Sequence, residues 1–268
     1  MPVDPQLTDR APGAAPPLEA RHLVKAFGGL RAVDDMSIAL GRGEILGVIG
    51  PNGAGKTTLF NLLAGSLRPN AGTVLAGGKD MTRAGAHRRI AVGIGRTFQI
   101  PRPFPGMTVL ENVLTGAQLQ SGERAWMNLV LPRRVGAEER AAIDKARGLL
   151  DFVTLSALES EPAKVLSGGQ RKLLELARVL MADPQVILLD EPAAGVNPSL
   201  LELIIDRLLK LNAQGKSILL IEHNMDAVAR LCRRVVVMAG GRYLTEGTPG
   251  DVAENPLVID AYLGGMAA

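Results

Sequence analysis

The sequence has few aromatic residues, a single cysteine and no long apolar run, and each scarcity narrows what the protein can be. Aromatic residues make up 3% of the 268 residues, so the core must consist mainly of leucine, valine, isoleucine and alanine. The lone Cys232 excludes an internal disulfide and fits a reducing compartment. We find neither a signal-peptide core nor the roughly eighteen apolar residues in a row that a membrane-spanning helix needs. We therefore expect that a partner would have to hold the chain at a membrane.

The net charge gives no support for a nucleic-acid partner. The formal net charge is +3, which is too weak to indicate a nucleic-acid partner. The chain is 47% hydrophobic and 21% charged, the ordinary composition of a globular protein. Its length allows one large or two small domains.

A glycine-rich loop is the most specific feature, and it fits the pattern G-x-x-x-x-G-K-[ST]. It consists of Gly50, Pro51, Asn52, Gly53, Ala54, Gly55, Lys56, Thr57 and Thr58. Residues 44–49 before it are typical of a buried strand, and residues 58–65 after it are apolar at helical spacing. Strand, glycine loop and helix together are the setting of a phosphate-binding P-loop.

The residue types of this loop suit a nucleoside triphosphate. Glycines allow a tight turn that aims backbone N–H groups at phosphate oxygens, and the helix N-terminus adds partial positive charge. We expect Lys56 to reach the β- and γ-phosphates and the Thr57 hydroxyl to bind Mg²⁺. The alternative, a glycine turn with an exposed lysine, leaves the flanking strand and helix unexplained.

Polar residues also follow two later predicted strands. Residues 186–189 form an apolar strand that leads into Asp190 and Glu191, at the strand end where ligands bind in open α/β sheets. We expect Asp190 to hold Mg²⁺ through water and Glu191 to orient and deprotonate an attacking water. His223 follows strand 217–221 at the same edge of the sheet, which favours contact with the γ-phosphate. The alternative for Asp190 and Glu191 is that they are two solvated acids at a strand end, and the alternative for His223 is a structural role.

A second glycine segment opens a helix ahead of the Asp-Glu strand. It consists of Leu166, Ser167, Gly168, Gly169 and Gln170. The N–H groups of its serine and glycines predict another anion site at a helix N-terminus, although the same residues are also common in ordinary turns. A chain that holds one nucleotide can use both anion sites only if the second serves a neighbouring copy.

Strands alternate with helices along most of the chain, which predicts an α/β fold with a mostly parallel sheet. The predicted strands cover residues 18–23, 32–40, 44–49, 72–82, 186–189, 217–221 and the hairpin 235–245, and Gln99 closes a further strand before the helical insertion. The predicted helices cover residues 58–65, 84–90, 109–119, 137–152, 168–181, 200–212 and 225–232. Three prolines within residues 101–105 mark a boundary before the helical insertion.

These patterns suggest a division of the chain. We expect residues 1–17 to be a disordered leader and residues 18–268 to be a single domain. Within it, residues 18–98 and 168–245 would form a nucleotide-binding core with a β subdomain, residues 99–167 a helical subdomain, and residues 246–268 a C-terminal tail.

Together the motifs resemble the nucleotide-binding subunit of an ABC transporter, over roughly residues 18–264. The matching segments are the Walker A loop (50–58), the Q-loop (Gln99), the signature (166–170), Walker B with its glutamate (186–191) and the switch histidine (His223). The resemblance implies a P-loop NTPase core, with an N-terminal antiparallel β subdomain and an inserted α-helical subdomain. It implies ATP and Mg²⁺ as ligands and ATP hydrolysis as the activity.

Several roles and partners follow from the resemblance alone. Phe27 would stack on adenine, the alternative being a core phenylalanine under a hairpin. Gln99 would take part in catalysis and metal binding and couple the site to the membrane partner. Ser167 and Gly169 would meet the γ-phosphate held by a second ATP-binding subunit, either identical or different. Transmembrane permease subunits would hold the chain at the cytoplasmic face of the cell membrane, and a solute-binding protein would act indirectly.

The branched-chain amino-acid uptake group is a closer resemblance. It extends over residues 25–33, 96–99, 107–113, 191–198 and 259–264, and the extra residues near 120–137 resemble the longer of that group's two ATPase subunits. Most ABC proteins carry Asp where this chain has Asn197, and the uptake group shares the Asn.

Three functions are compared on this basis. Import of a branched-chain or other hydrophobic amino acid is the leading one, and export of lipid or lipopolysaccharide is the alternative within the same class. A nucleotide-gated clamp on ribosomes or DNA belongs to another class. The single cassette and the lack of a heptad run argue against the clamp.

Overall fold

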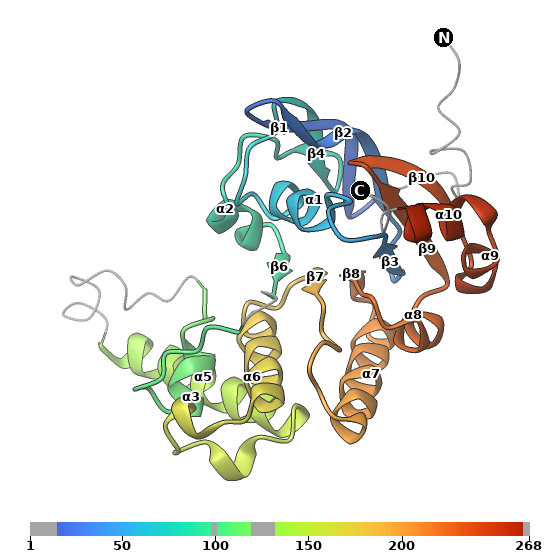
Figure 1. Cartoon of the computed structure of the whole chain (residues 1–268). Helices are drawn as coiled ribbons and strands as arrows, with labels where there is room; N and C mark the ends of the chain where they lie inside the picture. Colours follow the sequence, from blue (N-terminus) through green and yellow to red (C-terminus); the bar gives the residue numbers. More distant parts are fainter. Residues whose placement is uncertain (1–14, 98–100, 119–131, 265–268) are drawn as a thin grey trace. The chain divides into compact units, whose positions relative to one another are not determined.

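The structure, a computed structural model, describes residues 15–97, 101–118 and 132–264 (Figure 1). Most of the predicted leader and the Q-loop residue Gln99 lie outside these ranges, as do most of the extra residues near 120–137. The described residues form two compact units. The first comprises the residues up to Arg96, Gln185–Ala194 and those from Leu208 onward, and the second comprises Thr97–Pro184 and Gly195–Arg207.

The main sheet of the first unit has the strand order β10-β9-β3-β8-β7-β6. Its strands are β3 (Ile45–Ile49), β6 (Ile94–Arg96), β7 (Val186–Asp190), β8 (Ser217–Ile221), β9 (Arg234–Ala239) and β10 (Arg242–Gly247). All pairs are parallel except β9 with β10 (Figure 1). Every residue of β3, β7 and β8 is buried, which explains why these strands are almost continuously aliphatic. Because the three strands are parallel neighbours, the segments that follow them meet at one edge of the sheet.

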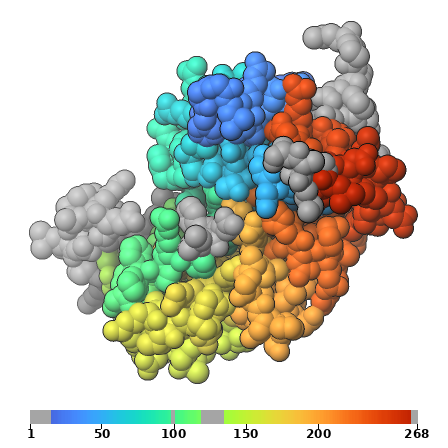
Figure 2. Space-filling model, viewed as in Figure 1, coloured from blue at the N-terminus to red at the C-terminus, as the bar shows by residue number. Residues whose placement is uncertain are grey.

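A second sheet in the same unit is antiparallel, with the order β2-β1-β4-β5. Its strands are β1 (Leu18–Phe27), β2 (Leu30–Leu40), β4 (Ala71–Ala76) and β5 (Lys79–Asp80). Strand β2 contacts β10 of the main sheet, and Asp34 accepts a 2.6 Å hydrogen bond from Arg242. Figure 2 shows the blue segment of β1 and β2 beside the red segment that includes β10.

Helix α1 (Lys56–Leu63) contacts strands of both sheets, and its Leu59 and Phe60 are fully buried. They share one core with Leu23 and Met36 of the antiparallel sheet and Leu46 of the main sheet. The predicted α/β class, with a mostly parallel sheet and an N-terminal antiparallel subdomain, is therefore what the first unit contains.

The C-terminal end of α1 rests on a buried arginine. Arg89 of α2 (Ala86–Ala91) is 0% exposed and donates hydrogen bonds to the carbonyls of Leu62 and Leu63. Its other donors bind the carbonyls of Met81, at 2.8 Å, and Ala84, at 3.2 Å. Burial lowers the pKa of the Arg89 guanidinium to about 10, and the charge of Asp80 partly offsets this. Arg89 thus satisfies helix-end carbonyls that have no partner within α1.

We expect Arg89→Met to lower the free energy of unfolding by about 2–4 kcal/mol, because it removes the buried hydrogen bonds that Arg89 donates to four carbonyls. Denaturant unfolding measures the change. The matched control is Arg88→Met, which alters an exposed arginine of the same helix. Equal stability of the two variants would contradict a stabilising role for Arg89.

The second unit contains α3 (Val109–Leu114), α5 (Pro132–Phe152), α6 (Gly168–Met181) and the first part of α7 (Pro198–Ala213). Helices α3, α5 and α6 contact one another, so the inserted subdomain is helical as predicted. Two boundaries differ from the prediction. Helix α3 ends at Leu114, before the predicted end at residue 119, and a turn at Thr115 and Gly116 follows it. Helix α5 begins at Pro132, before the predicted start at residue 137, and proline is accepted in the first turn of a helix.

The chain after β8 continues with α8 (Met225–Leu231), and after β10 with α9 (Pro249–Ala253) and α10 (Pro256–Gly264). The last two lie in the segment for which only a tail was predicted. Thr248 and Asp251 form a capping box at the start of α9. Among the residues that the structure describes, each helix is too short or too polar to cross a membrane.

Candidate nucleotide site

The glycine loop after β3 is held so closely by neighbouring backbone that side chains are excluded at two positions. Gly50 has φ 152°, and a Cβ there would lie 2.1 Å from the carbonyl oxygen of Met238. Gly55 has φ 93°, and a Cβ there would lie 2.1 Å from the carbonyl oxygen of Ala32. Any other residue would therefore push the loop off the two strands that support it.

Helix α1 begins directly after Gly55, and among the described residues no side chain caps its first turn. The first N–H groups of a helix have no partner within the helix, and an anion is a natural partner for them. The Lys56 side chain is buried, and its Nζ donates to the carbonyls of Gly50 (2.7 Å) and Pro51 (2.9 Å). Burial lowers the pKa of Lys56, and the charges of Glu191 and Asp190 oppose that shift.

At the end of β7, the Asp190 carboxylate is buried beside a cation. Arg96, the last residue of β6, donates from Nη2 to Asp190 Oδ2 at 3.3 Å and from Nη1 to Asn61 Oδ1 of α1 at 2.7 Å. Burial raises the pKa of Asp190, and the Arg96 charge opposes this. Arg96 therefore ties the acid at the strand end to the helix that follows the loop.

Glu191 and His223 come together as the order of β7 and β8 implies. His223 Nε2 lies 3.1 Å from Glu191 Oε1. Glu191 has φ 51°, a left-handed conformation that costs a residue with a side chain of order 1–3 kcal/mol. Its N–H donates to the carbonyl of Ile221 at 3.0 Å, which helps to hold this conformation.

Phe27 ends β1 and the residue is 48% exposed, so it is not a core residue under the hairpin. The ammonium of Lys25 lies 5.2 Å from the ring centroid. An exposed ring beside a cation is a suitable surface for stacking a nucleobase.

We expect Phe27→Ala to weaken ATP binding by about 1–3 kcal/mol, the value of one base stacked on an aromatic ring. Titration with a fluorescent ATP analogue measures this change. Leu30→Ala is the matched control, because Leu30 is 70% exposed and lies on the next strand of the same hairpin. Equal affinity of both variants and the unaltered chain would exclude stacking on Phe27.

The signature segment lies in the second unit and begins α6. The Ser167 hydroxyl accepts from the N–H of Gln170 at 3.3 Å, and Gln170 Oε1 accepts from the N–H of Ser167 at 2.9 Å. The two residues form a capping box, so the predicted anion site at this helix start already has internal partners. Ser167 and Gly168 are exposed, whereas Gly169 is buried. A Cβ at Gly169 would lie 1.9 Å from Leu200 Cδ2, so a side chain there would displace Leu200.

Two residues near the site were not identified from the sequence. Arg96 pairs with Asp190, and the signal would have been a charged residue ending a strand that neighbours β7. Glu222 is a 2% exposed acid directly before His223, and its position after a buried strand was the signal. Gln99 lies outside the described residues, so its predicted role has no structural test here.

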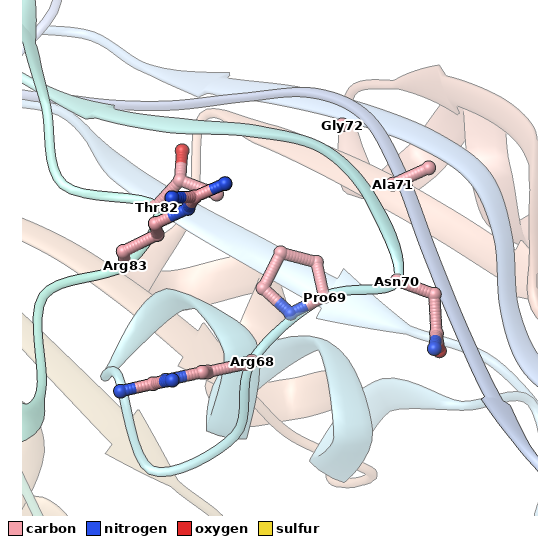
Figure 3. A pocket seen from close by; sticks show the side chains of 7 residues that line it. All are labelled: Arg68, Pro69, Asn70, Ala71, Gly72, Thr82 and Arg83. Carbon is pink, nitrogen blue, oxygen red and sulfur yellow. The ribbon is translucent and has the colours of Figure 1, made fainter.

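A separate hollow of about 330 Å³ is formed by the segment that follows α1 and by the residues after β5 (Figure 3). It is lined by Arg68, Pro69, Asn70, Ala71, Gly72, Thr82 and Arg83. None of the predicted site residues borders it.

The geometry defines a class of protein. A glycine loop that excludes side chains at Gly50 and Gly55 joins a buried parallel strand to an uncapped helix, and an Asp-Glu pair ends a nearby parallel strand. This arrangement is that of a P-loop nucleotide-binding α/β protein.

Comparisons with known proteins narrow the class. The ABC transporter family matches residues 33–194, and a family described as branched-chain amino acid ATP-binding cassette transporter matches residues 244–268. A curated protein of Archaeoglobus fulgidus, "Probable branched-chain amino acid transport ATP-binding protein LivG", is 42% identical over 92% of this chain and 95% of its own length. The "High-affinity branched-chain amino acid transport ATP-binding protein BraF" of Pseudomonas aeruginosa is 36% identical over 93% and 98%, respectively.

A solved structure supports the same assignment. A nucleotide-free ATP-binding cassette from an ABC transporter superimposes with a TM-score of 0.80 and 38% identity, over 91% of this chain and 97% of that one. The chain belongs to the ABC transporter family. It is an ATP-binding and ATP-hydrolysing subunit of a transporter complex, with the P-loop NTPase fold predicted from its sequence.

Proposed function

We propose that the chain powers the import of branched-chain or other hydrophobic amino acids across the cytoplasmic membrane. The observation that carries the proposal is the match of residues 244–268 to the branched-chain cassette family. In the described part of that segment, α9 and α10 follow β10. The names of the LivG and BraF relatives support the same solute class.

Mg²⁺ fits the donors at the site. Thr57 is exposed in the first turn of α1, and Asp190 ends β7, so a hydroxyl and a carboxylate are supplied. Hard oxygen donors such as these suit Mg²⁺, which also keeps several waters. Thr57 would bind the ion directly and Asp190 through water, with Gln99 as a further ligand. When bound, Mg²⁺ neutralises charge on the phosphate oxygens.

Each part of the site has its own role in ATP hydrolysis. The loop from Gly50 to Thr58 cradles the phosphates with its N–H groups, and Lys56 stabilises the charge that develops on the transferred phosphoryl group. Glu191 orients a water and accepts its proton at the carboxylate. His223, at 3.1 Å from Glu191 Oε1, keeps that carboxylate oriented and contacts the γ-phosphate.

A second ATP-binding subunit, identical or different, would complete each site. Ser167 to Gln170 of one subunit would meet the γ-phosphate held by the glycine loop of the other. The exposure of Ser167 and Gly168 supports this, because an incoming phosphate can reach them. Rearrangement of the capping box between Ser167 and Gln170 would free the N–H of Ser167 for it.

We expect Ser167→Arg to abolish hydrolysis while a monomer still binds ATP with its usual affinity. A bulky cation at the start of α6 blocks docking of the other subunit's phosphate, but leaves the variant's own glycine loop intact. Hydrolysis and nucleotide binding are measured on the same preparation. The matched control is Ser156→Arg, an exposed serine elsewhere in the second unit. Loss of the variant's own ATP binding would mean that Ser167 acts within one chain.

Transmembrane permease subunits would hold the chain at the cytoplasmic face of the membrane, and Gln99 would couple the site to them. A solute-binding protein would act on the permease and so only indirectly on this chain. The test is to co-purify the chain with its permease in detergent and to measure hydrolysis with and without a loaded solute-binding protein. A solute-binding protein loaded with leucine, isoleucine or valine should stimulate ATP hydrolysis. Stimulation by lipid or lipopolysaccharide instead, or co-purification with ribosomes or DNA, would contradict the proposal.

A further inference from the structure

A buried carboxylate joins the two loops that carry Glu191 and His223. Glu222 follows the last residue of β8, and the residue is 2% exposed. Its Oε1 accepts from the N–H of Ala193 at 2.6 Å. Its Oε2 accepts from the N–H groups of His223, at 3.1 Å, and Asn224, at 3.2 Å. One carboxylate therefore receives three backbone donors from two loops.

The first of these loops follows β7 and carries Glu191. The carbonyl of Ile221 accepts from the N–H of Glu191, and the carboxylate of Glu222 accepts from the N–H of Ala193, two residues later. Two consecutive residues at the end of β8 thus hold both ends of this short turn. Glu191 has φ 51° within it, a conformation that persists only where the surroundings enforce it.

The second loop carries His223. Its N–H and that of Asn224 converge on Glu222 Oε2, while the Asn224 side chain accepts from the N–H of Ala227 and caps α8. The backbone of His223 is therefore fixed between the buried carboxylate and the start of a helix. The side-chain contact between His223 and Glu191 spans the two loops that Glu222 joins.

We infer that Glu222 is a positioning residue for ATP hydrolysis, which fixes the distance and orientation of Glu191 relative to His223. The inference rests on the roles proposed above for these two residues. A carboxylate is required, because both of its oxygens accept hydrogen bonds. A glutamine at this position would turn an NH₂ group toward one set of backbone N–H donors, so one of the two loops would lose its anchor.

The test is Glu222→Gln. We expect kcat for ATP hydrolysis to fall about 10–100-fold, since small displacements of reacting groups cost on the order of 10² in rate. The KM for ATP and the affinity for an ATP analogue should change less than about twofold, because the glycine loop is untouched. Glu254→Gln, which changes an exposed glutamate near the C-terminus, is the matched control and should leave kcat unchanged. If Glu222→Gln does not fold, Glu222→Asp, which keeps the charge but shortens the reach, provides the same comparison.

A double-mutant cycle with His223→Ala separates positioning from general destabilisation. If Glu222 acts through the Glu191–His223 pair, the double variant Glu222→Gln/His223→Ala should have a kcat less than about threefold below that of His223→Ala alone. The same fold loss in both backgrounds, or a kcat for Glu222→Gln equal to that of the unaltered chain, would overturn the inference.

The single variants also separate this inference from the function on which it rests. Near-normal hydrolysis by both Glu191→Gln and His223→Ala would remove the proposed roles of those residues. If those two lose hydrolysis and Glu222→Gln does not, only the role of Glu222 fails.

Discussion

Replacing Lys56 by alanine is expected to reduce ATP hydrolysis to near the background rate. Lys56 is the buried cation of the glycine loop, and its Nζ already lies within 2.9 Å of two loop carbonyls. The change removes the charge that stabilises the transferred phosphoryl group, and loss of one such contact costs about 10²–10³ in rate. The truncated side chain also removes the hydrogen bonds that hold Lys56 against the carbonyls of Gly50 and Pro51, which weakens nucleotide binding as well. Release of inorganic phosphate measures the effect.

Lys79→Ala is the control for this change, because Lys79 is an exposed lysine on β5 of the same unit. It should hydrolyse ATP at the rate of the unaltered chain. Turnover by Lys56→Ala equal to that of the control would contradict the assignment of the glycine loop as the phosphate site.

Glu191→Gln is expected to separate ATP binding from hydrolysis. The glutamine keeps the size of the side chain and a hydrogen bond to His223, but it cannot accept a proton, which costs about 10²–10⁴ in rate. Lys56, Thr57 and the loop N–H groups are unchanged, so ATP binding should survive. Removing a carboxylate near the phosphates also relieves like-charge repulsion. Bound ATP should therefore persist and hold two subunits together.

Size-exclusion chromatography with ATP and Mg²⁺ measures this second effect. The variant should run as a dimer while releasing almost no phosphate, and it should run as a monomer without nucleotide. A mixed pair with the partner ATPase subunit is measured in parallel, because the natural pair can be unequal. Adding Ser167→Arg to the variant should abolish the dimer. Hydrolysis by Glu191→Gln near the rate of the unaltered chain would remove Glu191 from the catalytic role.

The sequence predicted those parts of the site that depend on local pattern and strand direction. The glycine spacing of residues 50–58 required the cradle seen after β3, and the structure gives its physical reason at Gly50 and Gly55. The proximity of Glu191 to His223 followed from two aliphatic strands that are parallel neighbours.

Contacts that depend on strand order over a long separation were not predictable. Arg96 and Asp190 are joined because β6 pairs with β7, although the helical insertion separates them in sequence. Glu222 follows a buried strand, but the local pattern could not show what its carboxylate binds, because its three donors come from two loops that meet only in the folded chain.

Short elements were missed for a different reason. Helices α9 and α10 have only 5 and 9 residues, so neither carries a hydrophobic periodicity long enough to indicate a helix, and the segment was predicted only as a tail. Asn197 was identified only as a departure from the usual Asp. Its Oδ1 accepts from the N–H of Leu200 at 2.9 Å, so this asparagine caps the start of α7.

Uptake by reconstituted vesicles tests the central claim most directly. The chain, its permease and its partner ATPase subunit are placed in proteoliposomes with ATP on the cassette side, and labelled leucine with the solute-binding protein is supplied on the other side. The account predicts leucine accumulation on the cassette side that requires ATP and disappears with Glu191→Gln. Accumulation that is equal with and without ATP, or movement of leucine away from the cassette side, would contradict it.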